Sequence, residues 1–394
     1  MNRMLGAQDG ETLEAPVMPD GIEPEDDDWS FFGTEACPTC GSPCGDSCTP
    51  PVLWYVDAAG LIMGRNDANR VWFSYQSNNN ANQIMHSQDA RTGWQGGWEI
   101  TLGRYLGGPT GSCGLLGDCN PCARWAIEAT YWGIADMEGD ASVTDPSYVS
   151  TPLMFTDVVY ADPSITDPVT DLFFGVYEHK LERRNDFHSV ELNLVRRRVG
   201  GMPHGLGVDW LCGVRYFRFD EELLFGSKAH NGAWGASPTE EGFLSDRTEN
   251  NLVGFQFGFD MRYYLGYNLT LSCVPKIGIY GNHIRNRFKA YRGDGEVFGP
   301  NPTPPVGDPV SGSYPVNSTD DALSFLTQID LGVDWQMTPR WSAFVGYRVV
   351  VATGIALADN QFPPYVVDIP EIADIDTNGE LVLHGGVAGL TYTW

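Results

Sequence analysis

The 394-residue sequence contains no run of about 18 consecutive apolar residues, which excludes a transmembrane helix. It is also poor in basic residues: there are 24 Lys and Arg against 51 Asp and Glu, and the formal net charge is -27. Because a nucleic-acid surface needs clustered Lys and Arg to bind phosphates, we exclude nucleic acid as a partner. The acidic excess predicts instead that the chain attracts cations.

Charged residues make up only 19% of the chain, whereas glycine and aromatic residues are abundant, with 46 Gly, 12 Trp, 17 Tyr and 19 Phe. This composition favours an all-β protein, because aromatic residues are preferred in strands and glycine in turns. The mean hydropathy of -0.23 would fit a soluble protein. A membrane barrel alternates lipid-facing and lumen-facing residues, however, so its average is equally unremarkable.

The first ten residues, Met1–Gly10, lack the apolar core of about 7–15 residues that a secretory signal peptide contains. Taken alone, this absence would favour the cytoplasm. Leu5–Ala7 followed by Gln8 is typical of the small-residue end of a cleavage site. We therefore expect that the start codon is assigned too far downstream and that the protein is exported.

The chain divides into two parts near residue 51. Residues 1–51 are rich in Pro and Cys, carry an acidic run at Glu23–Asp28 and show neither strand nor helix periodicity. They are predicted to form a flexible periplasmic segment. Residues 52–394 are predicted to form one transmembrane β-barrel.

Cysteine is concentrated in two Gly-containing stretches. They hold Cys37, Cys40, Cys44 and Cys48, and Cys113, Cys119 and Cys122. In an exported protein these groups predict disulfides. In a cytosolic protein they would suggest zinc, although the spacing Cys-x2-Cys-x3-Cys-x3-Cys is uncommon for a zinc finger. Cys212 and Cys273 stand alone in strand-like runs, where we expect inert thiols that face lipid.

Alternation with a period of two residues, which indicates strands, recurs along residues 52–394. In Leu252–Tyr264 one face is apolar, from Val253 to Tyr263, and the other carries small or polar residues. The polar faces of the strands carry charges that we predict to line the lumen: Glu99, Glu128, Glu191, Asp209, Arg215, Asp260, Arg262, Asp330, Asp334 and Arg348. These charges would set ion selectivity or, in a tight interior, neutralise one another.

The apolar faces bear Trp and Tyr near their ends. This favours a membrane barrel over a soluble sandwich, because such residues form girdles at the two membrane interfaces. The aromatic residues predicted at the interfaces are Trp98, Trp125, Trp210, Tyr263, Trp335, Trp341, Tyr392 and Trp394. Outer-membrane lipid is accordingly an expected partner.

Long and short gaps alternate between the strands, as expected for long outer loops and tight periplasmic turns. Met137–Asn185, Leu223–Glu249 and Tyr291–Asp321 are long, whereas Gly266–Tyr267 and Met337–Arg340 are short. The gaps predict a closed, antiparallel, up-and-down transmembrane β-barrel of about ten strands with both termini in the periplasm.

Two details of this barrel stay open. Twelve strands would result if Val71–Tyr75 paired with a segment such as Phe173–Tyr177. Pro275 interrupts the strand-like run Leu269–Tyr280 and cannot donate to a ladder, so we expect a bulge there. A ten-stranded barrel is narrow, well below the roughly sixteen strands that leave an open aqueous channel.

Three segments carry a resemblance to a known family. Leu381–Trp394 ends in an aromatic residue with Tyr392 two positions before it, like the assembly signal of outer-membrane barrels. Together with Trp54–Ala58 and Gly207–Glu221, it makes residues 52–394 similar to the planctomycete putative β-barrel porin family. The resemblance implies a barrel in a bacterial outer membrane whose last strand is recognised by the barrel insertion machinery. It brings no catalytic motif.

No catalytic or metal site stands out. Asp374, Asp376 and Asn378 copy the opening of a calcium loop, but its twelfth position is Gly385 rather than a bidentate Glu, which favours an acidic loop tip. Histidines such as His179 would suit an Asp/His protease site on a barrel, and His188 is another candidate, but no spacing singles either out. We predict that the chain is not an enzyme and uses no metal and no cofactor.

The function predicted from these patterns is porin-like passage of small, cationic solutes across the bacterial outer membrane. The alternative is a plugged structural or surface-binding barrel that displays long extracellular loops, and a barrel enzyme comes third. Conductance separates the first two, because only an open pore gives discrete channel steps.

Overall fold

The computed structural model describes residues 54–67, 69–106, 123–198, 205–304 and 311–394. All of them belong to one compact unit, Thr49–Trp394. The cysteine groups at residues 37–48 and 113–122 and the predicted N-terminal segment lie outside the described residues. The disulfides therefore remain predictions.

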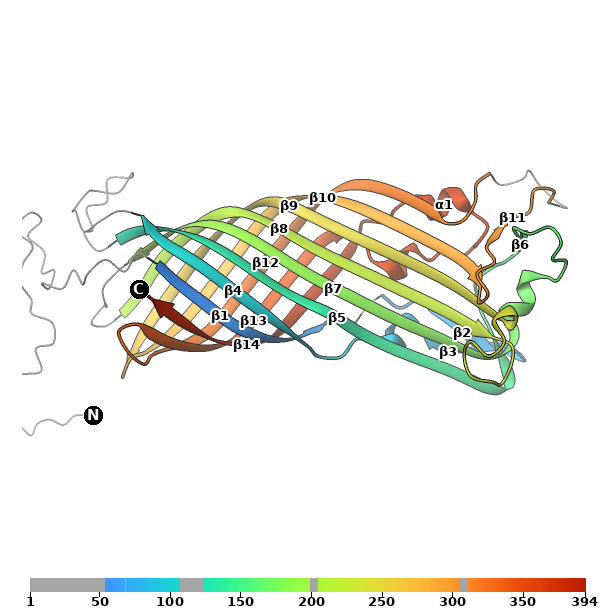
Figure 1. Cartoon of the computed structure of the whole chain (residues 1–394), viewed down its shortest axis with the longest axis horizontal. Helices are drawn as coiled ribbons and strands as arrows, with labels where there is room; N and C mark the ends of the chain where they lie inside the picture. Colours follow the sequence, from blue (N-terminus) through green and yellow to red (C-terminus); the bar gives the residue numbers. More distant parts are fainter. Residues whose placement is uncertain (1–53, 68, 107–122, 199–204, 305–310) are drawn as a thin grey trace, which may run out of the picture. The chain divides into compact units, whose positions relative to one another are not determined.

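Within the described residues, ten antiparallel strands close into a barrel (Figure 1). Each strand pairs with the next in this order, and the last pairs with the first: β1 (Trp54–Arg65), β4 (Gln95–Leu106), β5 (Ala123–Ser150), β7 (Phe174–Arg198), β8 (Gly205–Lys228), β9 (Glu241–Gly266), β10 (Leu269–Arg292), β12 (Val316–Gln336), β13 (Trp341–Ile355) and β14 (Gly379–Thr393). The predicted closed, antiparallel, up-and-down barrel is confirmed, with ten strands in its wall.

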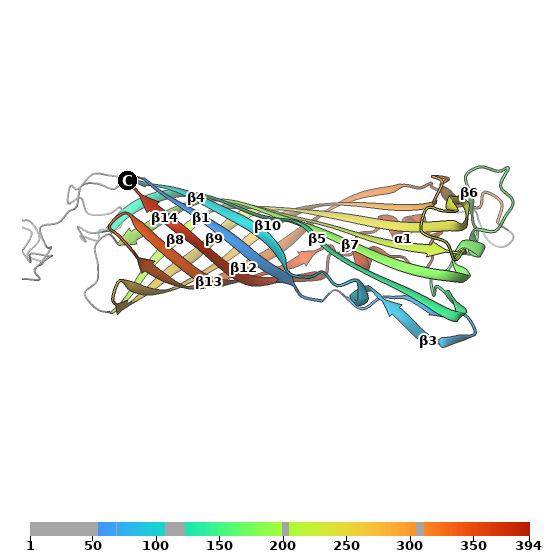
Figure 2. The same cartoon turned by 60° about the horizontal axis from the view of Figure 1, so that its bottom comes forward.

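The alternative of twelve strands is wrong. β2 (Trp72–Gln76) and β3 (Asn79–His86) form a hairpin that pairs with β5 in the ladder only through Tyr75 and Gln76. Figure 2 shows this hairpin at the margin of the barrel. With 5 and 8 residues, the two strands are shorter than the roughly 9–11 residues that cross a bilayer.

The outward faces of the strands carry an apolar band next to the short turns. On β9, Val253, Phe255 and Phe259 are exposed, Phe255 by 76%, whereas the inward-facing Gln256 and Asp260 are buried. A soluble sheet shows the reverse, because its apolar face is the buried one. The band therefore suits a lipid environment.

Several strands continue well past this band. β5, β7, β8, β9 and β10 have 28, 25, 24, 26 and 24 residues, against about 9–11 for a strand that crosses a bilayer. The predicted loops Met137–Asn185 and Leu223–Glu249 are therefore wrong over part of their length, because β5 runs on to Ser150 and β9 already begins at Glu241. Past the band the outward face of these strands is polar, so the sequence there lacks the outward apolar residues by which a membrane strand is recognised.

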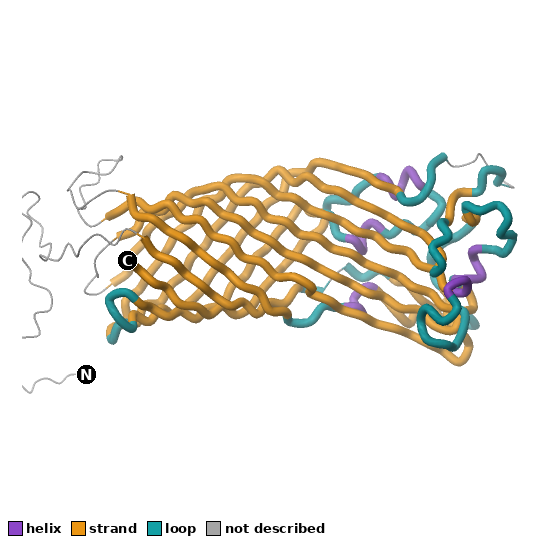
Figure 3. The backbone as a smooth tube through the Cα atoms, in the orientation of Figure 1, coloured by secondary structure: helices purple, strands orange, loops and turns teal. Residues whose placement is uncertain are grey.

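We call the part of the unit beyond the band the head; it comprises the described residues among 66–94, 137–185, 220–250, 283–320 and 356–380. Its inside is a hydrophobic core built by strands and connections together, with Phe73, Phe155, Phe225, Phe288 and Phe362 all buried. Figure 3 shows the short helices and most loops gathered there, opposite the C-terminus. No helix among the described residues is long and apolar enough to cross a membrane.

Short elements complete the head. They are η1 (Ser87–Ala90), β6 (Val158–Tyr160), η2 (Val169–Leu172), η3 (Pro238–Glu240), β11 (Phe298–Pro300), η4 (Ala358–Gln361) and α1 (Ile369–Ala373). β6 and β11 pair with each other and not with the barrel wall. The connections thus pack as in a soluble domain rather than project as free loops.

Pro275 lies in β10 without the bulge we expect from the sequence, so that prediction is wrong. It pairs in register with Ile329 of β12. Toward β9 the ladder skips Pro275 and its preceding residue, yet the register is the same on either side of the gap. The strand therefore accommodates Pro275, which has no backbone N–H to donate, by leaving out ladder pairs rather than by inserting an extra residue.

The first and last strands meet at the end of the barrel that carries the short turns, which we call the turn end. The Trp54 amide donates to the Trp394 carbonyl at 3.1 Å, and the Trp394 amide donates to the Trp54 carbonyl at 3.0 Å. The turns that join β9 to β10 and β12 to β13 lie at the same end (Figure 1). The head occupies the opposite end.

Candidate functional site: the interior of the barrel

The inward side chains form alternating polar and apolar layers between the turn end and the head. The first ionic layer, nearest the band, joins charges from strands that are not neighbours. Arg348 of β13 contacts Glu99 of β4, and its Nε lies 2.6 Å from Oδ1 of Asp330 on β12. Because β14 and β1 separate β13 from β4 in the wall, the Arg348–Glu99 contact crosses the interior.

The other half of the first ionic layer surrounds Glu191 of β7. Its carboxylate lies 2.9 Å from Nζ of Lys276 and 3.4 Å from Nη1 of Arg215. Arg215 also donates to Gln328 at 2.9 Å, and Gln328 donates to Asp330 at 2.7 Å, which links the two halves. In the described part of this layer three carboxylates face three cations, so their charges balance. In a balanced, buried network each charge is neutralised by its partners, so this layer offers no net charge with which to select ions.

The other charges predicted for the lumen lie nearer the turn end. Glu128 is buried and accepts a hydrogen bond from the tyrosine of β1. Arg262 and Asp260 form a two-point pair along β9 with both N–O distances at 2.9 Å, opposite Asp209 of β8. Asp334 lies close to the end of β12. These five charges therefore stand apart from the first ionic layer.

An apolar layer fills the barrel between the first ionic layer and the head. Phe187 and Phe219 stack with ring centroids 5.0 Å apart, and the Trp132 and Phe217 centroids lie 6.0 Å apart. Other members of the layer are Leu61, Met63, Leu252, Tyr280, Leu326, Val350, Leu381 and Leu383. None of these twelve side chains is more than 2% exposed, whereas side chains around an open pore would contact water. The described residues thus close the barrel at this level.

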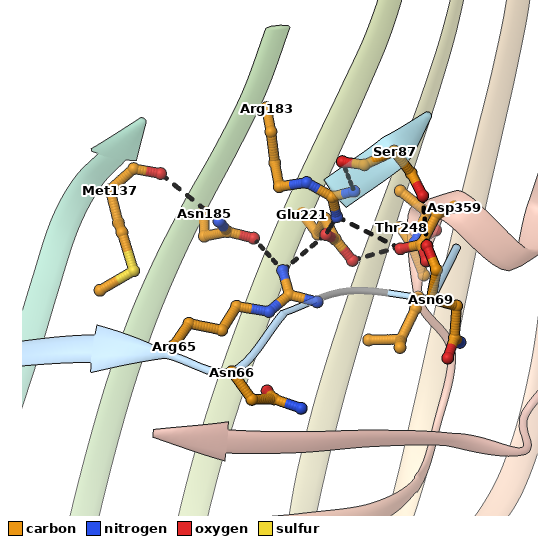
Figure 4. A network of polar contacts seen from close by, with 12 residues as sticks. Arg65, Asn66, Asn69, Ser87, Met137, Arg183, Asn185, Glu221, Thr248 and Asp359 are labelled. Carbon is orange, nitrogen blue, oxygen red and sulfur yellow. Dashed lines mark hydrogen bonds and ion pairs between the residues drawn. The ribbon is translucent and has the colours of Figure 1, made fainter. Parts of the chain in front are cut away.

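A second ionic layer separates the apolar layer from the head core (Figure 4). Glu221 of β8 accepts hydrogen bonds from Arg183 of β7 and from Arg65 at the end of β1, the latter at 2.6 Å. Arg183 also donates to Asp359 at 3.2 Å, and Arg65 donates to Asn185 at 2.6 Å. The four charged side chains are at most 2% exposed. Their burial makes each of them depend on its partners.

The connection between β13 and β14 enters the barrel at this second ionic layer. The Ala358 amide donates to Glu221 at 3.0 Å. Ala356 exchanges two hydrogen bonds with the Asn250 side chain of β9, at 2.8 and 2.9 Å. Inward-facing side chains of the opposite wall therefore hold this connection, residues 356–378, which we call the plug.

Within the plug, the surroundings of Asp359 change the pKa of its carboxyl group. Burial raises the pKa of the Asp359 carboxyl, the nearby Glu221 carboxylate raises it further, and Arg183 acts in the opposite direction. No charge of this layer stands out in the sequence, since Arg183 and Asp359 fall where no strand is expected. Glu221 has the same inward parity as Arg215, so extending that parity along β8 would have found it.

The aromatic residues predicted at the membrane interfaces lie on outward faces of the barrel. Those at the turn end are Trp125, Trp210, Tyr263, Trp335, Trp341, Tyr392 and Trp394. Trp98 lies nearer the head, where its ring centroid is 4.7 Å from that of Tyr131. Their contact with a membrane remains a prediction.

The two histidines considered for a protease-like site are in different places. His179 is buried in the head, with Nδ1 2.7 Å from Oγ of Ser74. His188 lies on the outward face, with Nδ1 2.9 Å from the Tyr131 hydroxyl. Neither histidine has an acidic partner among the hydrogen bonds of the described residues, so the geometry brings no Asp/His pair together around them.

The remaining candidates are ordinary parts of the fold. Cys212 and Cys273 carry free thiols and are half-buried on the outward faces of β8 and β10. In the segment that resembles a calcium loop, the Asp376 amide donates to Gln361 at 3.0 Å and the Asp376 carboxylate caps the Asn378 amide at 3.0 Å. Among the described residues, no group of three or more His, Cys, Asp or Glu side chains is arranged to hold a metal ion.

Comparison with solved structures returns outer-membrane proteins. The outer membrane protease OmpT from Escherichia coli is 11% identical over 88% of this chain and 98% of that chain, with a TM-score of 0.42. A major outer membrane protein from Thermus thermophilus is 10% identical over 86% of this chain and 99% of that chain, with a TM-score of 0.30. The toluene transporter TodX of P. putida is 10% identical over 87% of this chain and 90% of that chain, with a TM-score of 0.29.

No curated protein matches the chain. A family model does: the one described as Putative beta barrel porin-7 (BBP7) matches residues 112–379. This match covers more than half of the 394 residues, and it includes seven of the ten strands of the described barrel in full. The chain therefore belongs to the Putative beta barrel porin-7 family.

Proposed function

We propose that this protein sits in the bacterial outer membrane through its apolar band and displays the folded head at the cell surface, with its barrel closed to solutes in the described state. The exposed apolar side chains next to the turn end support the membrane position. Membership of a β-barrel porin family supports the same position. This is the plugged, surface-displaying alternative of the sequence analysis.

The apolar layer is the observation that carries this proposal. Passage of a cation needs a continuous path of water or polar groups, because moving a charge into an apolar region is very unfavourable. Phe187, Phe217 and Phe219 fill the interior between the two ionic layers. Above them the plug adds a second obstruction, held by Glu221 and Asn250.

Porin-like passage of small, cationic solutes is the second candidate. The family description favours it, and so does the construction of the second ionic layer, which rests partly on the plug rather than wholly on strands. Passage would require the plug to withdraw and the apolar layer to part. The net charge of -27 would then favour cations over anions.

Single-channel recording in planar lipid bilayers tests the two candidates. We expect the wild-type protein to insert without discrete conductance steps. The variant Phe187→Ala/Phe217→Ala/Phe219→Ala removes three rings of the apolar layer and is expected to give steps. Its matched control is Phe255→Ala/Phe257→Ala/Phe259→Ala, which removes three rings from the outward face of β9 and should stay silent.

Insertion is verified separately by the mobility shift on boiling in SDS that closed membrane barrels show. If the triple inner variant does not insert, the single variant Phe219→Ala, which leaves Phe187 and Phe217 in place, supplies the same comparison. Cation-selective steps from the wild-type protein would overturn the closed barrel and support the porin candidate. Silence of the inner variant that inserts would mean that the apolar layer is not the barrier.

A further inference from the structure

A groove of about 400 Å³ lies on the outward wall of the head, over β9, β10 and the start of β12. Its lining is unusually basic for a chain with a formal net charge of -27. The charged residues that line it are Arg247, Arg285, Arg287, Lys289, Glu222 and Glu249. Four cations thus face two carboxylates in one place.

The acidic residues of the groove and one of its arginines are already engaged. Arg247 forms a two-point pair with Asp220 at 2.6 and 3.0 Å. The Glu249 carboxylate lies 3.4 Å from the Arg218 guanidinium and also accepts a hydrogen bond from the Asn251 side chain. Glu222 accepts a hydrogen bond from Ser245 at 3.0 Å. None of these interactions uses the cations of β10.

Arg285, Arg287 and Lys289 have no ion pair or hydrogen bond from their side chains among the described residues. They occupy alternate positions of β10, so their side chains leave the same face of the strand, about 6–7 Å apart from one to the next. Three neighbouring positive charges repel one another unless an anion lies between them. We call these three residues the basic row.

The basic row starts above the apolar band, just beyond the exposed pair of His283 and Asp321, whose Nδ1 and Oδ1 atoms lie 2.8 Å apart. On the same strand Ile279 is 56% exposed, and on the neighbouring strand Leu323 is 63% exposed. Arg285 pairs in the ladder with Thr319 of β12, and Thr319 is about 13 Å along that strand from Leu323 at roughly 3.3 Å per residue. The tilt of barrel strands shortens this distance further along the barrel axis. From this position the long Arg285 side chain reaches the polar edge of a bilayer. Arg287 and Lys289 lie about 7 and 13 Å further along β10 at the same rise per residue, at the depth of the lipid headgroups rather than of the chains.

We propose that the basic row binds the phosphate groups of outer-leaflet lipids. Guanidinium groups bind phosphate oxygens through two parallel hydrogen bonds, and the lysine adds a point charge. The position of the groove favours lipid as the source of the phosphate, because the exposed apolar band below the groove would hold lipid chains next to the basic row. This inference rests on the membrane position proposed above.

The test uses the full-length protein in detergent micelles, with a diphosphorylated lipid A as the probe. The readout is the temperature at which the folded gel band converts to the unfolded one, measured as lipid is added. The variant Arg285→Gln/Arg287→Gln/Lys289→Gln removes the basic row. The control Arg70→Gln/Arg184→Gln/Arg340→Gln removes three exposed cations elsewhere.

We expect lipid A to raise the conversion temperature of the wild-type protein and of the control at the same lipid concentration. The basic-row variant should need roughly hundredfold more lipid, since each Lys or Arg near an anionic surface contributes about fivefold. The conservative variant Arg285→Lys/Arg287→Lys keeps the charge and should stay within about tenfold of wild type. It also supplies the comparison if the neutral variant does not fold.

Three results would overturn the proposal. One is an unchanged lipid response in the basic-row variant. The second is an equal response to a dephosphorylated lipid A, which would mean that the acyl chains alone are recognised. The third is an equal response to inorganic phosphate, which would indicate a free-anion site. A wild-type protein without any boiling-dependent shift in the absence of lipid would instead refute the membrane barrel itself.

Discussion

The two halves of one strand differ in the face that carries their apolar residues. Near the turns, β9 exposes Val253 and Phe255 outward and buries Gln256 inward; in the head, the same strand exposes Arg247 outward and buries Leu244 inward. The alternation keeps its parity, but the polarity of the two faces is exchanged. The exchange is the pattern expected of a wall whose surroundings change from apolar to aqueous partway along the strand.

The exchange also changes what fills the barrel. In the half near the turns, lipid would cover the outward apolar side chains, and the inside is held by paired charges such as Glu191 with Lys276. In the head, water meets the outward charges, and the inside is an apolar core with rings such as Phe225. The second ionic layer lies where the half near the turns meets the head. Substitutions in this layer and on either side of it should therefore show where the boundary between the two halves lies.

The largest effect is expected at the boundary itself, from Glu221→Gln. Glu221 holds Arg65 and Arg183, both buried, and breaking a buried ion pair from one side is expected to lower the free energy of unfolding by about 3–5 kcal/mol. The measurement is urea unfolding in detergent micelles followed by tryptophan fluorescence.

The matched control for that variant is Glu222→Gln, at the next residue on the outward face. Its carboxylate is half-buried and bonds only to Ser245 among the hydrogen bonds of the described residues. The control should stay within about 0.5 kcal/mol of wild type. Equal losses in the two variants would mean that the boundary does not depend on the buried charges.

Part of the polar interior can be predicted from the sequence and part cannot, as the first ionic layer shows. The parity of β13 puts Arg348 on the polar face, and the parity of β4 does the same for Glu99. That the two side chains meet depends on how the barrel closes, because 249 positions separate them in the sequence. The ten strands follow from their alternation near the turns, where outward apolar residues recur.

The head is where prediction from the sequence fails. Residues 137–150 and 241–249 belong to strands, yet their outward positions are polar, as at Glu138 and Arg247. A strand that has a polar outward face and packs on an apolar core has the same sequence pattern as a loop or as a strand of a soluble protein. Asp359 is missed because the core that buries it is assembled from connections far apart in the chain. Glu221, by contrast, keeps the inward parity of Arg215 and could be found by extending that parity along β8.

The second largest effect sharpens the comparison on the outward face. Leu331→Arg places a charge in the apolar band of β12, where the native side chain is 52% exposed. An arginine facing lipid near the bilayer midplane destabilises a barrel by about 2–4 kcal/mol. Thr144→Arg lies at an exposed outward position of β5 in the head and should change stability by less than about 0.5 kcal/mol. Refolding into lipid vesicles, scored by the boiling-dependent shift, compares the two.

If both arginine variants insert equally well, the outward faces of the band and of the head would have one and the same environment. The proposed membrane position of the band would then be untenable. If both fail, the head wall would also require an apolar surface, which its exposed charges contradict.

A smaller effect probes the packed inside of the half near the turns. Gly103 lies on the inward face opposite Tyr55, and a Cβ at this position would overlap the Tyr55 ring, whose hydroxyl donates to Glu128. Gly103→Ala should therefore displace the tyrosine and lower the free energy of unfolding by about 1–3 kcal/mol. Gly60→Ala is the control, because a Cβ there meets nothing within 4 Å. Losses of the same size from both would show that strand conformation, rather than inward packing, sets the response.

The smallest expected effect is the pH dependence of the plug. Burial and the Glu221 carboxylate raise the pKa of Asp359 above its ordinary value of 3.8. A carboxyl whose pKa is raised by folding contributes stability that is fully present below the unfolded pKa and is lost as the pH rises through the folded pKa. The wild-type protein should therefore lose stability relative to Asp359→Asn as the pH rises above 3.8, by at most about 1.4 kcal/mol per pH unit. Urea unfolding of both proteins in small steps between about pH 4 and pH 5, directly above the ordinary pKa of the carboxyl, measures this difference. A difference that grows in the opposite direction would mean that Arg183 outweighs the burial of Asp359, and the plug would then be held most firmly at neutral pH.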